Sequence, residues 1–220
     1  MNSHRRRFVT LLLSMSLAAC PHASGDIITG AGPGAGPHVK VFDSRATNEL
    51  DSFFAYDVNF SGGVRVAAGD VTGDGTPDMI TGSGPGGGPH VKVFDGLSGD
   101  ERESFLAFSP DFLGGVYVAA GDVNNDGFAD VITGAGSDAA PHVRVFSGET
   151  GGELASFFAY AATFTGGVRV ASGDVNGDGF SDIVTGAGAG GGTHVKVFDG
   201  QSGVEKKSFF AYSPTFTGGV

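Results

Sequence analysis

A strict internal repeat constrains this chain more than any other feature of its sequence. The string His-Val-(Lys/Arg)-Val-Phe begins at His38, His90, His142 and His194, and so recurs at a constant step of 52 residues. Gly-Gly-Val and Gly-Asp-Val recur with the same step, without insertion or deletion. A fixed period of this length indicates an array of similar structural units, in which each unit buries its apolar face against the next.

Each unit is predicted to contain four short β-strands. Apolar residues alternate at a spacing of two and turn residues follow roughly every 8 to 12 positions, as in antiparallel sheets. In the second unit this pattern places strands over residues 64–71, 78–83, 90–94 and 103–108. The 40 glycines oppose long helices, because a glycine inside a helix costs about 1 kcal/mol relative to alanine.

The predicted fold is therefore all-β, a β-propeller-like array of four-stranded antiparallel blades with about 3.75 repeats, forming an incomplete or a four-bladed ring. The repeats occupy residues 26–220, with units near 26–63, 64–115, 116–167 and 168–220. The first strand of each unit carries small side chains and is predicted to lie innermost. The first unit starts at Asp26, the counterpart of Asp78, and so lacks that strand. An unpaired blade edge of this kind is expected to favour self-association.

The repeated aromatic and histidine residues are predicted to be structural. The rings at 53–54, 157–158 and 209–210 on the fourth strand, and at 60, 112, 164 and 216 after it, are expected to pack blade against blade. An exposed aromatic surface that binds glycans is the alternative. The four histidines occupy equivalent places on successive units, so each is expected to form a hydrogen bond at the start of the third strand.

The first 19 residues are predicted to be a signal peptide. Arg5, Arg6 and Arg7 precede a largely apolar stretch over residues 8–19, which is shorter than the roughly 20 residues needed to span a bilayer. The sequence at 17–20 resembles the lipobox of bacterial lipoproteins, which makes Cys20 the implied lipidation site and residues 20–25 a tether. The expected location is the cell envelope, with a lipid anchor. Secretion after ordinary cleavage is the alternative.

The charge of the chain argues against nucleic acid as a partner. The formal net charge is −11, and no run of lysine or arginine lies outside the first seven residues. Phosphate backbones therefore have no basic surface to bind, and contact with a membrane is expected only through the lipid anchor. Since the sequence contains no nucleophile elbow, zinc-ligand pair or phosphate-binding loop, we do not expect an enzyme.

Three equivalent loops between the first and second strands are predicted to bind a cation. They share the pattern Asp-x-(Asn/Thr)-x-Asp-Gly-x-x-Asp, with side-chain oxygens at positions 1, 3, 5 and 9 and glycine at position 6. Alternate residues of such a loop can turn inward around a hard cation. An EF-hand is excluded because position 12 is Thr81, Thr133 or Thr185 and not glutamate. Metal-free Asx turns are the alternative.

The unit resembles the FG-GAP or VCBS-type repeat, the calcium-binding blade of propellers such as the head of integrin alpha chains. The loop, followed by Asp-(Ile/Met/Val)-(Ile/Val)-Thr-Gly at 78–82, 130–134 and 182–186, carries this resemblance. The resemblance implies Ca²⁺ at about three sites, with position 7 contributing a backbone carbonyl. The implied ligands are Asp70, Thr72, Asp74, Thr76 and Asp78; Asp122, Asn124, Asp126, Phe128 and Asp130; and Asp174, Asn176, Asp178, Phe180 and Asp182.

The first of these sites is expected to be the weakest, since Thr72 replaces asparagine at position 3. The sequence therefore predicts an exported, non-catalytic adhesion or ligand-binding module with Ca²⁺-stabilised loops and an unidentified protein or glycan as partner. The alternative is a glycan-binding lectin or an accessory module of a polysaccharide-degrading enzyme.

Overall fold

The computed structural model describes residues 8–12, 16–18, 25–213 and 215–220, and its regular structure is entirely β. Blade 1 contains β3 (Asp26–Gly30), β4 (His38–Phe42) and β5 (Glu49–Phe54). Blade 2 contains β6 (Val64–Gly69), β7 (Asp78–Ser83), β8 (His90–Phe94) and β9 (Glu101–Leu106). Blade 3 contains β10 (Val116–Gly121), β11 (Asp130–Ala135), β12 (His142–Phe146) and β13 (Glu153–Phe158). Blade 4 contains β14 (Val168–Gly173), β15 (Asp182–Ala187), β16 (His194–Phe198) and β17 (Glu205–Phe210). Two strands, β1 (Phe8–Leu12) and β2 (Ser16–Ala18), precede the blades.

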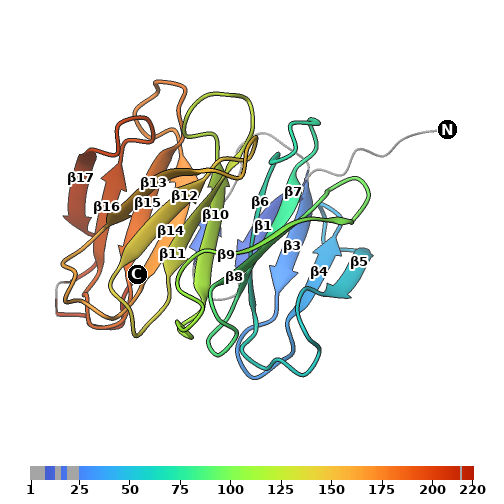
Figure 1. The fold of residues 1–220 in the computed structure, drawn as a ribbon, viewed down its shortest axis with the longest axis horizontal. Coiled ribbons are helices and arrows are strands. Elements are labelled where there is room, and N and C mark those ends of the chain that lie inside the picture. Colours follow the sequence, from blue (N-terminus) through green and yellow to red (C-terminus); the bar gives the residue numbers. More distant parts are fainter. Residues whose placement is uncertain (1–7, 13–15, 19–24, 214) are drawn as a thin grey trace.

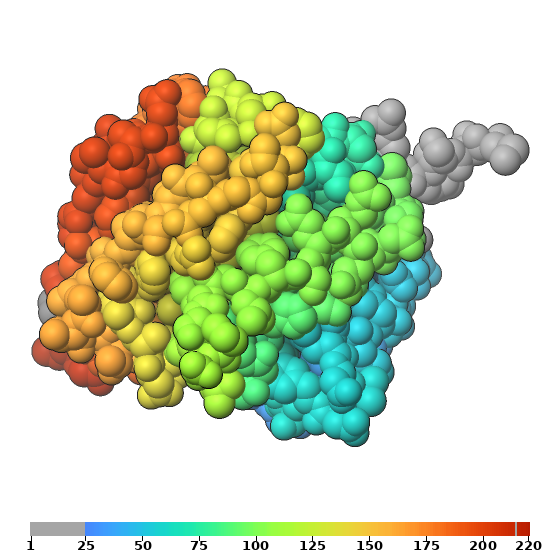
Figure 2. Space-filling view, in the orientation of Figure 1, coloured from blue at the N-terminus to red at the C-terminus, as the bar shows by residue number. Residues whose placement is uncertain are grey.

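Within each of blades 2 to 4, every strand pairs antiparallel with the next strand along the chain. The four sheets follow one another across the molecule, with β5 and β17 on its two flanks and β6 and β10 near its middle (Figure 1). In the space-filling view the units form successive bands (Figure 2). The predicted propeller-like array of four-stranded blades is confirmed. None of the described residues belongs to a helix long and apolar enough to cross a membrane.

Three of the predicted strand boundaries in blade 2 are wrong. The first strand ends at Gly69, because the chain turns at Asp70, whose carboxylate accepts hydrogen bonds from the N–H groups of Asp74 and Gly75. The fourth strand starts and ends two residues earlier than predicted. A register shift between Val93 and Phe94 pairs Phe94 with Glu101. The strand therefore includes Glu101 and Arg102, two polar residues that lie before the predicted start.

The position of the innermost strand in blade 1 is taken by β1, which lies within the predicted signal peptide. This strand pairs parallel with β3, whereas the innermost strands of the other blades are antiparallel to their neighbours. β2 pairs antiparallel with β1 on its other side. The predicted lipidation site Cys20 lies outside the described residues, as do the arginines at positions 5–7.

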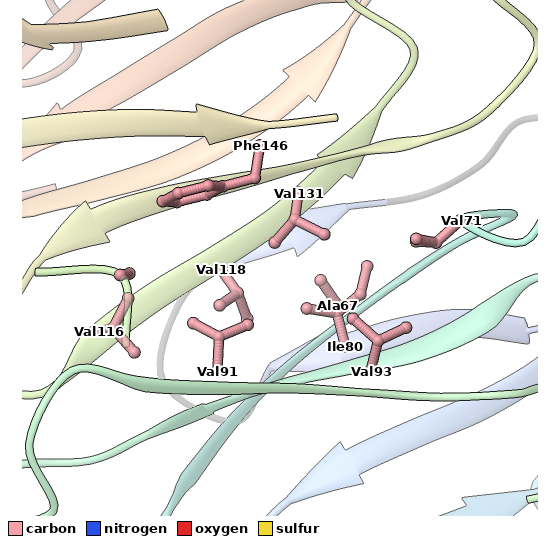
Figure 3. Close-up of a cluster of buried hydrophobic side chains, with 10 residues drawn as sticks. Ala67, Val71, Ile80, Val91, Val93, Val116, Val118, Val131 and Phe146 are labelled. Atoms are coloured by element: carbon pink, nitrogen blue, oxygen red, sulfur yellow. The ribbon is translucent and has the colours of Figure 1, made fainter. Parts of the chain in front are cut away.

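The core lies between the blades. Ile80, Val91 and Val93 from blade 2 face Val118 and Val131 from blade 3, and all five are buried (Figure 3). Equivalent clusters lie between blades 1 and 2 and between blades 3 and 4. The innermost strands β6, β10 and β14 contact one another in order. They lie innermost as predicted and are closely packed, since a Cβ added to Gly69 would lie 2.7 Å from the Cβ of Ala120 in the next blade.

The phenylalanine pairs on the fourth strands are divided between two environments. The first ring packs on the next blade as predicted: Phe53 lies 5.0 Å from Phe94 and Phe157 lies 4.7 Å from Phe198, measured between ring centroids. For the second ring the prediction is wrong, because successive residues of a strand point to opposite faces. Phe54 and Phe158 are about half exposed, and they contact the histidine rings of their own blades.

Each of the four repeated histidines has a hydrogen-bond partner at the start of the third strand, as predicted. Each begins the third strand of its blade, and its Nε2 lies 2.7–2.8 Å from the hydroxyl of a serine on the fourth strand. The serines are Ser52, Ser104, Ser156 and Ser208.

Hydrogen bonds from side chains connect each blade to the third strand of the next. The hydroxyls of Tyr56 and Tyr160 donate to the carbonyls of His90 and His194, both at 2.8 Å. Phe108 occupies the equivalent place between them and has no hydroxyl. At that interface the guanidinium of Arg144 donates to the carbonyl of Ala107 instead.

The backbone approaches itself most closely at three glycines that follow the second strands. A Cβ added to Gly84, Gly136 or Gly188 would lie 1.8–1.9 Å from a carbonyl oxygen of the Gly-Gly segment that precedes the first strand of the same blade.

We expect Gly136→Ala to destabilise the fold by about 1–3 kcal/mol, since the backbone must move to admit the methyl group. Gly32→Ala is the matched control, because no heavy atom lies within 4 Å of a Cβ there. Urea unfolding curves measure both, and equal midpoints would contradict the packing described.

The half-buried Tyr160 of blade 3 makes the stability of the protein sensitive to alkaline pH. Burial raises the pKa of Tyr160 to about 12, above the value of about 10 for an exposed phenol. The unfolded chain therefore loses this proton first, so the stabilisation is complete below pH 10 and declines as the pH rises towards 12.

We expect Tyr160→Phe to lower stability by about 1 kcal/mol at pH 8 through loss of one hydrogen bond, and to reduce the further loss between pH 10 and 12. Chemical unfolding at several pH values measures both effects. A variant whose alkaline decline is as steep as that of the wild type would contradict this assignment.

Candidate functional site

The three Asp-rich loops each connect the first strand of a blade to its second, so they lie in equivalent places in blades 2, 3 and 4. In the first loop, Asp70 Oδ1 and Oδ2 accept hydrogen bonds from the N–H groups of Asp74 (3.0 Å) and Gly75 (2.8 Å). Asp74 Oδ1 accepts one from the N–H of Thr76 at 2.7 Å. The carboxylates at positions 1 and 5 therefore hold the turn closed.

The second and third loops repeat these bonds. Asp122 accepts from Asp126 and Gly127, and Asp174 accepts from Asp178 and Gly179, at 2.9–3.2 Å. Asp126 and Asp178 in turn accept from Phe128 and Phe180, both at 2.9 Å. Glycine at position 6 has a φ of 83° in the first loop and 90° in the other two. Glycine adopts this left-handed conformation readily, whereas a residue with a Cβ is strained there.

The carboxylates at position 9 are buried beneath the loops. Asp78, Asp130 and Asp182 are at most 1% exposed. One oxygen of each accepts a hydrogen bond from a backbone N–H near the start of its loop, at 2.8–2.9 Å. The other accepts from the N–H of Gly96, Gly148 or Gly200, which follow the third strands. Position 9 therefore fixes the loop to the neighbouring turn of the same blade.

The environment of the loops shifts the pKa values of their carboxyls in opposite directions. Burial raises the pKa of Asp130 to about 6, and the negative charges of Asp126 and Asp122 act in the same direction. Burial also raises the pKa of Asp78. Hydrogen bonds from the loop N–H groups, chiefly that of Gly179, lower the pKa of the exposed Asp174. A positive charge would therefore be stabilised most at the buried end of the loop.

Position 3 differs between the loops. Asn124 accepts from the N–H of Asp126 at 3.0 Å and donates to its carboxylate at 2.8 Å, and Asn176 makes the same pair of bonds with Asp178. The hydroxyl of Thr72 is buried and has no hydrogen-bond partner among the described residues. It lies near the Asp78 carboxyl and acts to lower the pKa of that group, against the larger effect of burial, which raises it.

Backbone hydrogen bonds connect successive loops across the blade interfaces. The N–H of Ala129, at position 8 of the second loop, donates to the carbonyl of Asp70 in the first at 2.8 Å. The N–H of Ser181 donates in the same way to the carbonyl of Asp122 at 2.7 Å. The ring of Phe128 also covers the first loop, where a Cβ on Gly73 would lie 2.4 Å from it. The three loops therefore form one continuous array.

The donor chemistry of the loops fits Ca²⁺, which takes six to eight oxygen ligands. The predicted side-chain ligands all provide oxygen atoms, and the unpaired hydroxyl of Thr72 is one of them. The carboxylates are hydrogen-bonded to loop N–H groups, and within the described part of the chain no three His, Cys, Asp or Glu side chains gather closely enough to hold a metal ion.

Two groups of side chains were not predicted from the sequence. The first lines two equivalent pockets of about 290 Å³ each, formed by Tyr56, Phe60, His90 and Lys92 and by their counterparts 104 residues later. The second is Arg65, Tyr117 and Arg169, at the second position of the innermost strands. Its sequence signal is a long polar side chain between two valines in each of three units.

Comparison with solved structures gives similarity at the level of the fold. A chain from the "Crystal Structure of Mitotic Checkpoint Complex" aligns with a TM-score of 0.54 and 14% identity, covering 87% of this chain and 53% of that one. A chain from the "Crystal structure of exotype rhamnogalacturonan lyase YesX" aligns with a TM-score of 0.49 and 14% identity, covering 78% of this chain and 40% of that one. The chain thus spans about half the length of these structures or less. No curated protein matches it in sequence.

Comparison with protein families gives a match described as "FG-GAP-like repeat", over residues 70–133 and 122–185. The two matched segments overlap and together cover residues 70–185, which is more than half of the chain. Each segment begins at the first aspartate of one Asp-rich loop and ends shortly after the last aspartate of the next. The chain therefore belongs to the family of FG-GAP-like repeat proteins.

Proposed function

We propose that this protein is an exported, non-catalytic binding module in which three Ca²⁺-binding loops stabilise the contacts between blades. The observation that carries the proposal is the pair of backbone hydrogen bonds that connect the second and third loops to the loops before them, from Ala129 to Asp70 and from Ser181 to Asp122. Because these two bonds cross the interfaces between blades 2 and 3 and between blades 3 and 4, an ion that orders a loop also orders the interface beside it.

The ligands would be the oxygens at positions 1, 3, 5, 7 and 9 of each loop. Bound Ca²⁺ would supply the positive charge that the acidic loops lack. Positions 1 and 5 already lie on the same turn, since the N–H of the position 5 residue donates to the carboxylate at position 1. The buried carboxylate at position 9, whose pKa is raised in Asp78 and Asp130, would gain most from a nearby cation.

Export is supported by the basic and apolar pattern of the first 19 residues, with Cys20 as the proposed site of lipidation in the cell envelope. Extracellular Ca²⁺ concentrations suit weak sites, for which dissociation constants of about 0.1–1 mM are usual. The partner would be a protein or a glycan, because the net charge of −11 disfavours nucleic acid.

Calcium binding predicts a saturable rise in thermal stability. At ten times the dissociation constant each occupied site adds about 1.4 kcal/mol, so three sites should shift the melting temperature by several degrees. Asp126→Asn should remove about a third of that shift, whereas the matched control Asp111→Asn, at an exposed residue outside the loops, should not change it. Thr72→Asn should tighten the first site. Differential scanning calorimetry with Ca²⁺ and with EDTA measures these effects, and an unchanged melting temperature in the wild type would refute the proposal.

Glycan binding is a second candidate function, favoured by the two equivalent pockets. In the pocket of blades 1 and 2 the rings of Tyr56 and Phe60 meet edge to face at 6.3 Å, beside His90 and Lys92. Aromatic rings beside polar side chains provide both the apolar and the hydrogen-bonding surface that a sugar ring requires.

A glycan array followed by calorimetry tests this function. Phe164→Ala, in the pocket of blades 3 and 4, should weaken binding of a glycan hit at least tenfold at one of two sites. Phe112→Ala, at the equivalent position of the interface between blades 2 and 3, is the matched control. Equal loss in both variants, or no hit on the array, would exclude the pockets as glycan sites.

A further inference from the structure

Three long polar side chains occupy the same position on neighbouring innermost strands. Arg65, Tyr117 and Arg169 are the second residues of β6, β10 and β14, and each is partly exposed between two buried valines. Since successive residues of a strand point to opposite faces, these three side chains share a face that the valines avoid. The innermost strands contact one another in order, which brings the three side chains together.

The tyrosine ring lies close to both guanidinium groups. Arg65 Cζ is 3.8 Å from the centroid of the Tyr117 ring, and Arg169 Cζ is 5.7 Å from it. Both distances fall within the range of about 6 Å in which a ring attracts a cation. The two positively charged guanidinium groups beside this ring also repel each other, and a nearby negative charge would reduce that repulsion.

No Asp or Glu side chain in the described part of the chain forms an ion pair with either arginine. Each guanidinium donates to a main-chain oxygen, Arg65 to that of Ser83 at 3.3 Å and Arg169 to that of Val220, the last residue of the sequence, at 2.7 Å. The cations on the third strands differ, because Lys40, Lys92, Arg144 and Lys196 are each paired with a glutamate of the same blade. Burial and the charge of Arg169 lower the pKa of Arg65, so the site disfavours its own positive charge.

We propose that Arg65, Tyr117 and Arg169 form an oxyanion-binding site on the innermost strands of blades 2 to 4. A guanidinium has five N–H donors in a planar fork, and each of these uses one donor in the hydrogen bonds described. The free donors suit the oxygens of a carboxylate, sulfate or phosphate group, which accept paired hydrogen bonds from arginine. Tyr117 keeps the two guanidiniums in place, and the oxyanion removes their repulsion. This site is separate from the Asp-rich loops and does not depend on Ca²⁺.

Titration with sodium sulfate, compared with sodium chloride at equal ionic strength, tests the proposal on the full-length chain in calcium buffer. Sulfate should bind saturably at one site by isothermal calorimetry, and sodium glutarate serves as the carboxylate probe. Because sulfate also stabilises proteins without binding, the variants decide the outcome. Arg65→Gln and Arg169→Gln should each weaken binding about tenfold or more, whereas Arg169→Lys, which keeps the charge, should weaken it less. Arg102→Gln, at an exposed arginine of β9, is the matched control.

The proposal is overturned if the wild type does not distinguish sulfate from chloride, or if both glutamine variants bind sulfate as tightly as the wild type. Should one glutamine variant fail to fold, the comparison of Arg169→Lys with Arg102→Gln still tests it, since equal affinity in these two contradicts a role for the guanidinium fork. Binding of glutarate but not sulfate would restrict the ligand to carboxylates and support the site. Loss of the calcium response in Asp126→Asn leaves each of these outcomes unchanged, so the two proposals fail independently.

Discussion

Each sheet of this protein has an apolar face that only a neighbouring sheet can cover. Blade 2 alone would expose Ile80, Val91 and Val93, and these side chains are buried because blade 3 lies against them (Figure 3). The dependence is visible where no following sheet is described: Phe209 of blade 4 is 48% exposed, whereas its counterpart Phe157 packs against the next blade. Stability in such an array comes from the interfaces between units as much as from the units themselves.

The Asp-rich loops add a polar connection to this apolar one. Their carboxylates close the turns through backbone N–H groups, and the backbone of each loop then donates to the loop before it. Asp78 and Asp130 are buried beneath these turns, and burial raises the pKa of both carboxyls. The negative charges of Asp126 and Asp122 raise the pKa of Asp130 further. The interfaces between blades therefore depend on ordered loops. The negative charge of the same loops favours a bound cation. This combination is the physical basis for the proposed role of calcium.

Much of the fold follows from the sequence, because the period of two and the 52-residue repeat are both local patterns. They place the second and third strands of blade 2 correctly, and they predict the hydrogen bond of each histidine at the start of the third strand. The predicted boundaries of the fourth strand are wrong because the bulge between Val93 and Phe94 depends on how the strands pair. The alternation of apolar and polar residues along the sequence does not contain that information. The side chains of Arg65, Tyr117 and Arg169 lie more than 100 residues apart along the chain at their extremes, and only the stacking of blades shows that they meet.

Phe108 stands where the equivalent positions of the repeat have Tyr56 and Tyr160. This difference determines which interfaces between blades are sensitive to alkaline pH. Two interfaces use a phenol hydroxyl to reach the next blade, whereas the middle one uses the guanidinium of Arg144, which also pairs with Glu153. A phenol loses its contact in alkali, but an arginine keeps its charge at every accessible pH. Separation in alkali would therefore leave blades 2 and 3 together as the most persistent pair, with blades 1 and 4 detaching from either side.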